Sequence, residues 1–109
     1  MICFFQAEKF KLDLGAYSGT AGDSLSYHSE REFTTHDNDN DSKYSKNCAT
    51  FEGKKSGGWW FGACALANLN AFNHGTNASV NWEHGIHWNE FGGPSISLKS
   101  AQMAIRPMN

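Results

Sequence analysis

This sequence has little net charge, only three cysteines and no long apolar run. Its 109 residues carry nine Lys and Arg against eleven Asp and Glu, a net charge of −2. No basic field would attract phosphates or an anionic membrane surface, so the composition gives no support for nucleic-acid binding. No segment approaches the ~20 apolar residues of a transmembrane helix, and we expect no membrane insertion.

The three cysteines, Cys3, Cys48 and Cys64, form no CxxC motif. A zinc ribbon and a CxxC redox site are therefore not indicated, and an odd number leaves one thiol over. The apolar start of the chain lacks the length and basic region of a signal peptide. Two sequons, at Asn40 and Asn77, are compatible with a secreted glycoprotein.

Composition favours a small, loop-rich globule. Hydrophobic residues make up 39% of the chain, which has eleven Gly and a mean hydropathy of −0.55. Four Trp and eight Phe must supply much of the core. A domain of this size buries a limited share of its surface, so a disulfide bond or a bound metal ion would contribute much to its stability.

Hydrophobic periodicity predicts few regular elements. Residues 8–17 alternate apolar and polar side chains, which predicts a half-buried strand, and the alternation within 96–105 predicts a closing strand. Residues 63–71 fit either a short helix or turns, since small residues are mixed with asparagines. The polar segment 37–47 must be a loop. We expect the adjacent Trp59 and Trp60 to be core residues rather than a sugar-stacking platform.

Three carboxylates crowd this loop, at Asp37, Asp39 and Asp41. Calcium would relieve their repulsion, because it takes six to eight oxygen ligands in irregular geometry. An EF-hand is excluded, since Ser42 stands where that loop needs Gly and Cys48 where it needs a bidentate Glu. On spacing alone, a solvated loop without an ion remains equally open.

Several further motifs follow in a fixed order along residues 8–107. They occupy residues 17–28, 33–35, 37–41, 47–49, 57–61, 64, 68–70, 85–88, 97–99 and 103–107. In this order they resemble the C-terminal half of the fibrinogen-related domain family, which includes fibrinogen chains, ficolins, tachylectins, tenascins and angiopoietins. The segment 17–28 looks closest to ficolin-like and invertebrate lectin-like members.

The resemblance implies an α+β fold that is small and loop-rich, with short antiparallel strands, little helix and a disulfide-stapled calcium-binding subdomain. Residues 1–7 are then a divergent leader. Residues 8–109 form a partial fibrinogen C-terminal-like domain, comprising the end of the central sheet and the calcium- and ligand-binding subdomain. Members often oligomerise, so missing N-terminal regions or Cys3 could join this chain to another.

The resemblance also implies a calcium site and a disulfide. Asp39 and Asp41 would supply carboxylates, and counting back from Cys48 suggests the backbone carbonyls of Tyr44 and Lys46. A bond between Cys48 and Cys64 would close a loop of about seventeen residues, which stabilises by roughly 3 kcal/mol in the chain-entropy model.

In lectin-like members a pocket for acetyl groups lies beside this loop, near a cis peptide that here would be Ala63–Cys64. The residues that map onto it are Phe51, Cys64, Ala65, Trp82, Glu83 and Ile96. Phe51 and Trp82 could line a cup for the acetyl methyl group. Ala65 stands where lectin-like members commonly have His, and Glu83 is hard to accommodate beside a carbonyl acceptor.

Two functions follow from the resemblance. The first, which we place ahead, is a calcium-dependent extracellular lectin of innate immunity that binds acetylated glycans. The alternative is a protein-binding module for a receptor, matrix or peptide ligand, which the missing pocket His and Glu83 favour. No catalytic triad or nucleophile elbow is recognisable, and we expect no enzymatic activity.

Overall fold

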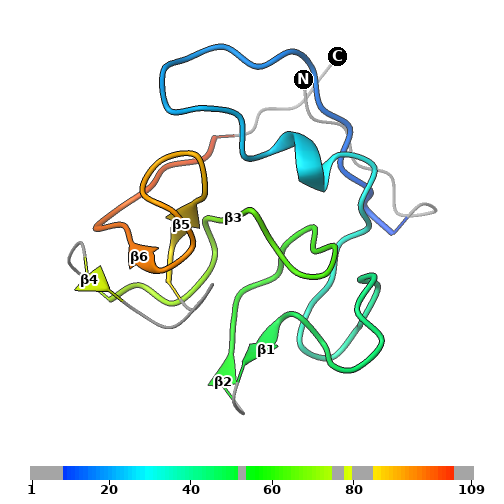
Figure 1. Cartoon of the computed structure of the whole chain (residues 1–109). Helices are drawn as coiled ribbons and strands as arrows, with labels where there is room; N and C mark the ends of the chain where they lie inside the picture. Colours follow the sequence, from blue (N-terminus) through cyan, green and yellow to red (C-terminus); the bar gives the residue numbers. More distant parts are fainter. Residues whose placement is uncertain (1–8, 52–53, 75–77, 80–84, 105–109) are drawn as a thin grey trace.

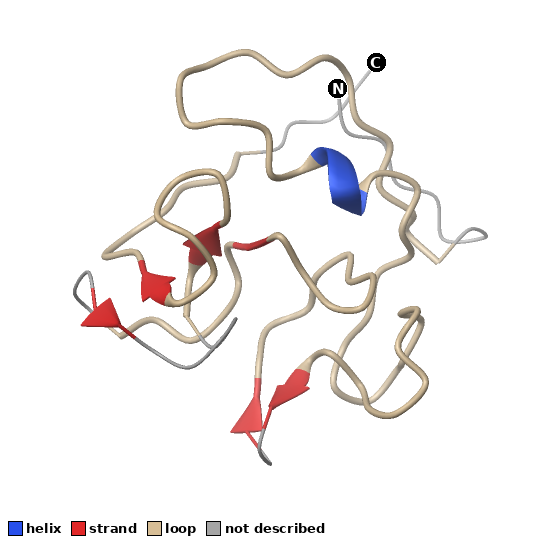
Figure 2. Ribbon diagram, in the orientation of Figure 1, coloured by secondary structure: helices blue, strands red, loops and turns tan. Residues whose placement is uncertain are grey.

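Short elements separated by long loops make up the chain (Figure 1). The computed structural model describes residues 9–51, 54–74, 78–79 and 85–104. The described elements are a 3-10 helix, η2 (Ser26–His28), and the strands β1 (Thr50–Phe51), β2 (Lys54–Lys55), β3 (Ala67–Asn68), β4 (Ala78–Ser79), β5 (His87–Trp88) and β6 (Ile96–Ser97). Figure 2 shows how little of the ribbon is helix or strand.

The strands pair only in twos. β1 pairs with β2, β3 with β5 and β4 with β6, each antiparallel. In Figure 1 the β3–β5 and β4–β6 pairs lie toward the left, and β1–β2 lies apart from them at the bottom of the view. Ladders of two residues contribute few hydrogen bonds, so loop packing must hold most of the fold together.

The strand predicted over 8–17 is not formed in its described part, which begins at Lys9. Lys9 and Phe10 have φ values of 55° and 56°, so the backbone turns through the left-handed region there. Leu12 then exchanges two backbone hydrogen bonds with the segment after η2, donating to Arg31 O at 3.0 Å and accepting from Glu30 N at 2.8 Å. The alternation correctly marked Leu12 as buried, but Phe10, on the same predicted face, is 46% exposed, and the predicted backbone conformation is wrong.

The closing strand is shorter than predicted. β6 covers Ile96–Ser97, the described residues 98–104 contain no strand, and Ile105 lies outside the description. Residues 63–71 form turns around β3, so the turn alternative is correct and the helix is not. Asparagine side chains explain this choice, because Asn68 Oδ1 accepts a hydrogen bond from Asn70 N at 3.0 Å.

Aromatic residues from one segment dominate the core. Trp59 and Trp60 are both buried, as predicted, and their ring centroids lie 5.1 Å apart. Trp60 Nε1 donates to Phe10 O at 2.9 Å, and Phe33 packs edge-on against the Trp60 ring. The buried cluster comprises Leu12, Cys48, Ala49, Trp59, Trp60, Phe61, Cys64 and Ala65.

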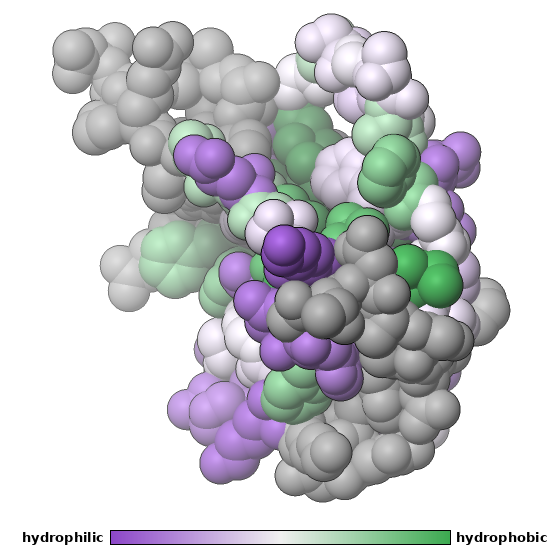
Figure 3. All heavy atoms as spheres, turned by 90° about the vertical axis from the view of Figure 1, so that its left-hand side faces the viewer, coloured by the Kyte–Doolittle hydropathy of each residue, from purple (hydrophilic) through white to green (hydrophobic). Residues whose placement is uncertain are grey.

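Hydrophobic atoms also reach the surface. On the face seen in Figure 3 they are exposed in several separate places among hydrophilic residues. Exposed large apolar side chains include Leu66 and Phe91. Among the described residues, no helix has the length and apolar character needed to cross a membrane.

Candidate functional site

The acidic loop is built from side chains that accept hydrogen bonds from groups two residues away. Asp37 Oδ1 accepts a hydrogen bond from Thr35 Oγ1 at 2.7 Å, and Asp39 Oδ1 accepts one from Asp41 N at 3.1 Å. Such contacts favour turns over helix or strand. The prediction of a loop over 37–47 is confirmed, and its acidic residues determine its shape.

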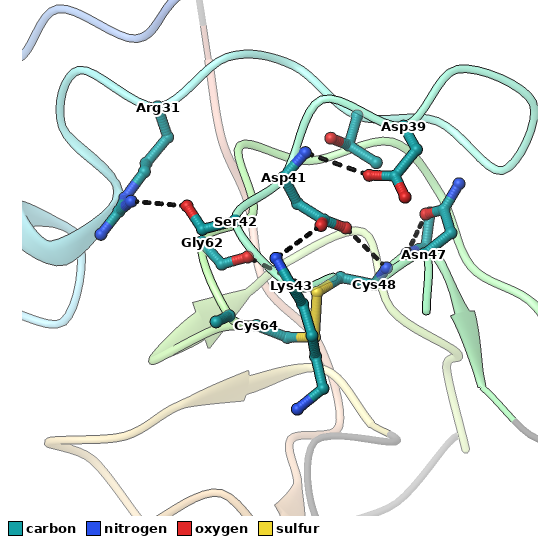
Figure 4. Close-up of a disulfide and its surroundings, with 12 residues drawn as sticks. Arg31, Asp39, Asp41, Ser42, Lys43, Asn47, Cys48, Gly62 and Cys64 are labelled. Atoms are coloured by element: carbon teal, nitrogen blue, oxygen red, sulfur yellow. Dashed lines mark hydrogen bonds between the residues drawn. A yellow bond between two sulfur atoms is a disulfide. The ribbon is translucent and has the colours of Figure 1, made fainter. Parts of the chain in front are cut away.

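Asp41 joins this loop to the disulfide. Its Oδ1 accepts from Lys43 N at 2.9 Å and its Oδ2 from Cys48 N at 2.8 Å. In Figure 4 the carboxylates of Asp39 and Asp41 lie close together. Burial and the neighbouring Asp39 carboxylate raise the pKa of Asp41, although the two N–H donors oppose this rise.

Two adjacent carboxylates suit a hard cation. A calcium ion between Asp39 and Asp41 would relieve their repulsion, and oxygen atoms are the ligands that it prefers. The described residues contain no group of three or more His, Cys, Asp or Glu side chains that could hold a metal, so further ligands would be carbonyls or water. Tyr44 and Lys46 are both exposed, and the use of their backbone carbonyls as calcium ligands stays a prediction.

A disulfide fastens the end of the acidic loop to the core. Cys48 and Cys64 are bonded, as the resemblance implied, with their Cα atoms 5.5 Å apart. The peptide Ala63–Cys64 is cis. Ser42 N also donates to Gly62 O at 3.1 Å, so a second contact joins the loop to the turn that carries Cys64.

The turn at residues 62–67 packs against helix η2. Tyr27 Oη accepts a hydrogen bond from Ala63 N at 2.9 Å. A Cβ atom on Gly62 would lie 2.5 Å from that hydroxyl oxygen, so this approach needs glycine. Nothing in the sequence indicated this contact, because Tyr27 and Ala63 are 36 residues apart.

Arg31 connects η2 to the acidic loop. Its guanidinium lies over the Tyr27 ring, 4.9 Å from the centroid, and its Nη1 donates to Ser42 Oγ at 2.9 Å. Figure 4 shows this side chain reaching across to Ser42. Helix, loop and turn are therefore joined in one connected unit, of which the sequence had indicated only the loop and the disulfide.

The predicted acetyl pocket is described only in part. Cys64 and Ala65 are adjacent and buried, Phe51 lies in β1, and Ile96 is half-buried in β6. Trp82 and Glu83 lie outside the described residues. The pocket stays a prediction. Leu66, which the prediction omitted, is 38% exposed beside the buried Ala65.

The two sequons differ in what the structure describes. Asn40 Nδ2 donates to Phe33 O at 2.9 Å, and Asn40 N donates to Thr34 Oγ1 at 2.9 Å. The amide that would carry a glycan at Asn40 is therefore engaged within the fold. Asn77 lies outside the described residues.

Comparison with known proteins identifies the family. The family described as "Fibrinogen beta and gamma chains, C-terminal globular domain" matches residues 4–108. This match spans nearly the whole chain, and the chain belongs to that family. The small fold with short antiparallel strands, little helix and one disulfide is a fibrinogen-like globe fold.

Similar individual proteins include angiopoietin-related ones. The chain is 45% identical over 104 residues to angiopoietin-related protein 6 from Homo sapiens, covering 94% of this chain and 21% of that protein. It is 43% identical over 98 residues to fibrinogen-like protein A from Apostichopus parvimensis, covering 90% of this chain and 33% of that protein. The chain thus spans about a fifth to a third of these relatives.

Solved structures with a similar fold agree with this family assignment. The fibrinogen-like globe domain of human ANGPTL6 superposes with a TM-score of 0.75 at 43% identity, covering 86% of this chain and 41% of that one. Lamprey fibrin D-dimer, in complex with the peptide Gly-His-Arg-Pro-amide, superposes with a TM-score of 0.70 at 25% identity, covering 86% of this chain and 34% of that one.

Proposed function

We propose that this chain is the ligand-binding part of a non-enzymatic, extracellular fibrinogen-like module whose partner is a protein or peptide. Family membership and the angiopoietin-related relatives support this function. A disulfide between buried cysteines is typical of proteins that fold in an oxidising, extracellular environment.

The observation that carries the proposal is the double link between the acidic loop and the turn. Cys48 is bonded to Cys64, and Ser42 N donates to Gly62 O. These two links, with the bond from Cys48 N to Asp41 Oδ2 inside the acidic loop, hold two loops in a fixed relative position. A preorganised edge of this kind loses little entropy when a partner docks.

Apolar side chains beside this unit suit a protein partner. Leu66 is 38% exposed and Phe91 is 58% exposed. Their segments are joined by a hydrogen bond of 2.8 Å from Asn89 N to Leu66 O. Exposed aliphatic and aromatic groups are typical of the central part of protein interfaces.

The comparisons favour this alternative over the lectin function. The relatives described above are angiopoietin-related and fibrinogen-like proteins, and none of these is a ficolin or tachylectin. One superposed structure, the lamprey D-dimer, binds a peptide. Ala65 agrees, because its methyl group cannot make the hydrogen bond that a histidine offers at this position.

Calorimetry with two probes tests the proposal. We expect the peptide Gly-His-Arg-Pro-amide to bind saturably and N-acetylglucosamine to give no heat and no competition. The variant Leu66→Ser should weaken peptide binding, whereas Ser45→Ala, at an exposed position of the acidic loop, serves as the control. Sugar binding, or no peptide binding by the folded chain, would refute the proposed function.

Calcium is the second component of the proposal. Asp39 and Asp41 would hold the ion, with the carbonyls of Tyr44 and Lys46 completing the protein ligands. The bound ion would supply positive charge that cancels the repulsion between the two carboxylates and orders the loop. Support comes from the close approach of these carboxylates and the raised pKa of Asp41.

A calcium titration tests this component separately. Asp39→Asn together with Asp41→Asn should abolish saturable calcium binding. Asp37→Asn is the control within the same loop, since it removes one carboxylate charge, against two in the double variant, and leaves both proposed ligands. Equal losses in the two variants would show that loop charge, rather than a defined site, attracts the ion.

A further inference from the structure

One buried histidine joins the helix to the turn that carries Cys64. His28, the last residue of η2, is 0% exposed. Its Nδ1 lies 2.8 Å from Trp60 O, and its Nε2 lies 3.1 Å from Leu66 N and 3.2 Å from Ala67 N. A single imidazole ring therefore contacts both sides of the 61–65 segment.

These partners determine the protonation state of the ring. A carbonyl oxygen can only accept, so Nδ1 must carry the proton that is donated to Trp60 O. Two backbone N–H groups can only donate, so Nε2 must be unprotonated and act as the acceptor. Only the neutral imidazole satisfies all three contacts.

A proton added at Nε2 would face the N–H groups of Leu66 and Ala67. Three donors would then meet without an acceptor, and a charge would be buried. Aromatic rings surround the imidazole, with the Tyr27 centroid at 5.0 Å and the Trp59 centroid at 6.0 Å. Neither ring carries an anion that could compensate.

The ionisable groups that act on His28, His87 and Arg31, both oppose its protonation. Burial lowers the pKa of His28 to about 4 from an ordinary 6.5, while the hydrogen bond to Trp60 O opposes this shift and the nearby His87 and Arg31 lower the pKa further. The packed segment 59–67 contributes no titratable side chain except Cys64, which is in the disulfide. No described acid within reach of the ring favours its charged form.

We propose that His28 is an acid-sensitive clasp, which holds the turn at residues 62–67 against η2 while neutral and releases that turn when protonated. The released turn would include Cys64, Ala65 and the exposed Leu66. As the pH falls from 6.5 toward 4, the binding edge would be held in its fixed position less and less often, and the affinity for a partner bound there would fall. This last step rests on the proposed function, whereas the clasp itself does not.

The direction of the pH effect follows from the lowered pKa. The folded state prefers neutral His28, so the contribution of the clasp is complete above pH 6.5 and is lost as the pH falls toward 4. Between these values the released state binds one more proton than the closed state. The equilibrium constant for release should then rise about tenfold for each pH unit of acidification.

Hydrogen exchange on the full chain tests the clasp without any ligand. Protection factors of the Leu66 and Ala67 amides should fall about tenfold per pH unit between pH 6 and 4.5. The Thr34 amide, which bonds to Trp59 O at 2.9 Å, should lose much less. A parallel loss at Thr34 would indicate global unfolding, and unchanged protection at Leu66 would show no release. Either result overturns the clasp.

Variants and a titration complete the test. His28→Gln keeps an acceptor but cannot titrate, so the pH dependence at Leu66 should disappear, whereas His74→Gln at an exposed position should retain it. If His28→Gln does not fold, NMR titration of His28 in the native chain decides, and a midpoint near 6.5 overturns the proposal. Failure of Gly-His-Arg-Pro-amide to bind at neutral pH, with normal acid release of the amides, would contradict only the proposed function.

Discussion

The acidic loop and the His28 clasp hold neighbouring parts of the fold in different ways. In the loop, Asp39 and Asp41 bond to backbone two residues away. The His28 contacts join residues 32 to 39 positions apart. Local contacts can form before the rest of the fold, whereas the clasp exists only once the chain has folded around it.

This difference has consequences for sequence interpretation. A run of Asp and Asn predicts side-chain turns wherever it occurs, because the acceptors lie on the same short segment. A histidine gives no comparable sign of its partners. His28 was part of a recognised motif, but its burial, tautomer and contacts came only from the structure.

The largest predicted effect comes from removing the disulfide that joins the acidic loop to the turn held by His28. Replacing Cys48 and Cys64 together by Ala should lower the free energy of unfolding by about 3 kcal/mol, because the unfolded chain regains the entropy of an open loop. Urea unfolding measures this loss. Cys3→Ser, which leaves the disulfide intact, is the control, and an equal loss in that variant would contradict the prediction.

A smaller effect should follow from removing one anchor of the acidic loop. Asn47 Nδ2 donates to Thr35 O at 2.9 Å, and its Oδ1 accepts from Ala49 N at 2.8 Å. Asn47→Ala should cost about 1–2 kcal/mol, since each such bond contributes roughly 1 kcal/mol. Thermal unfolding beside Ser45→Ala gives the comparison. If the two variants were equally stable, Asn47 would not anchor the loop.

The smallest effect concerns the exposed bridge between the two regions. Arg31→Lys removes the guanidinium hydrogen bond to Ser42 Oγ and should cost about 0.5 kcal/mol, because an exposed hydrogen bond and an exposed cation–π contact each contribute little. A double-mutant cycle with Ser42→Ala isolates this contact. Additive losses in the cycle would mean that Arg31 and Ser42 do not couple the loop to η2.

Sequence reasoning succeeded for the site where the signal was local or covalent. It predicted the loop over 37–47, and the resemblance supplied the Cys48–Cys64 bond and the cis peptide at Ala63–Cys64. It also predicted that Trp59 and Trp60 are buried. The calcium ligands remain a prediction, and the pocket residues Trp82 and Glu83 lie outside the described residues.

Elsewhere the sequence indicated burial but not backbone shape. Leu12 is buried as its alternating pattern requires, yet the predicted strand is interrupted by the left-handed turn at Lys9 and Phe10. Alternation reports which side chains avoid water. It does not report whether a partner strand is available for pairing.

By itself, the sequence determined the family, the polar loop and the aromatic core, because each depends on residue types at short spacing or on motifs in a fixed order. Tertiary structure alone decided that Tyr27, His28 and Arg31 connect helix, loop and turn. The physical reason is that a hydrogen bond depends on distance and direction. When its partners are separated in sequence, by 11 residues for Arg31 and Ser42 and by 32 for His28 and Trp60, only the folded path of the chain sets both.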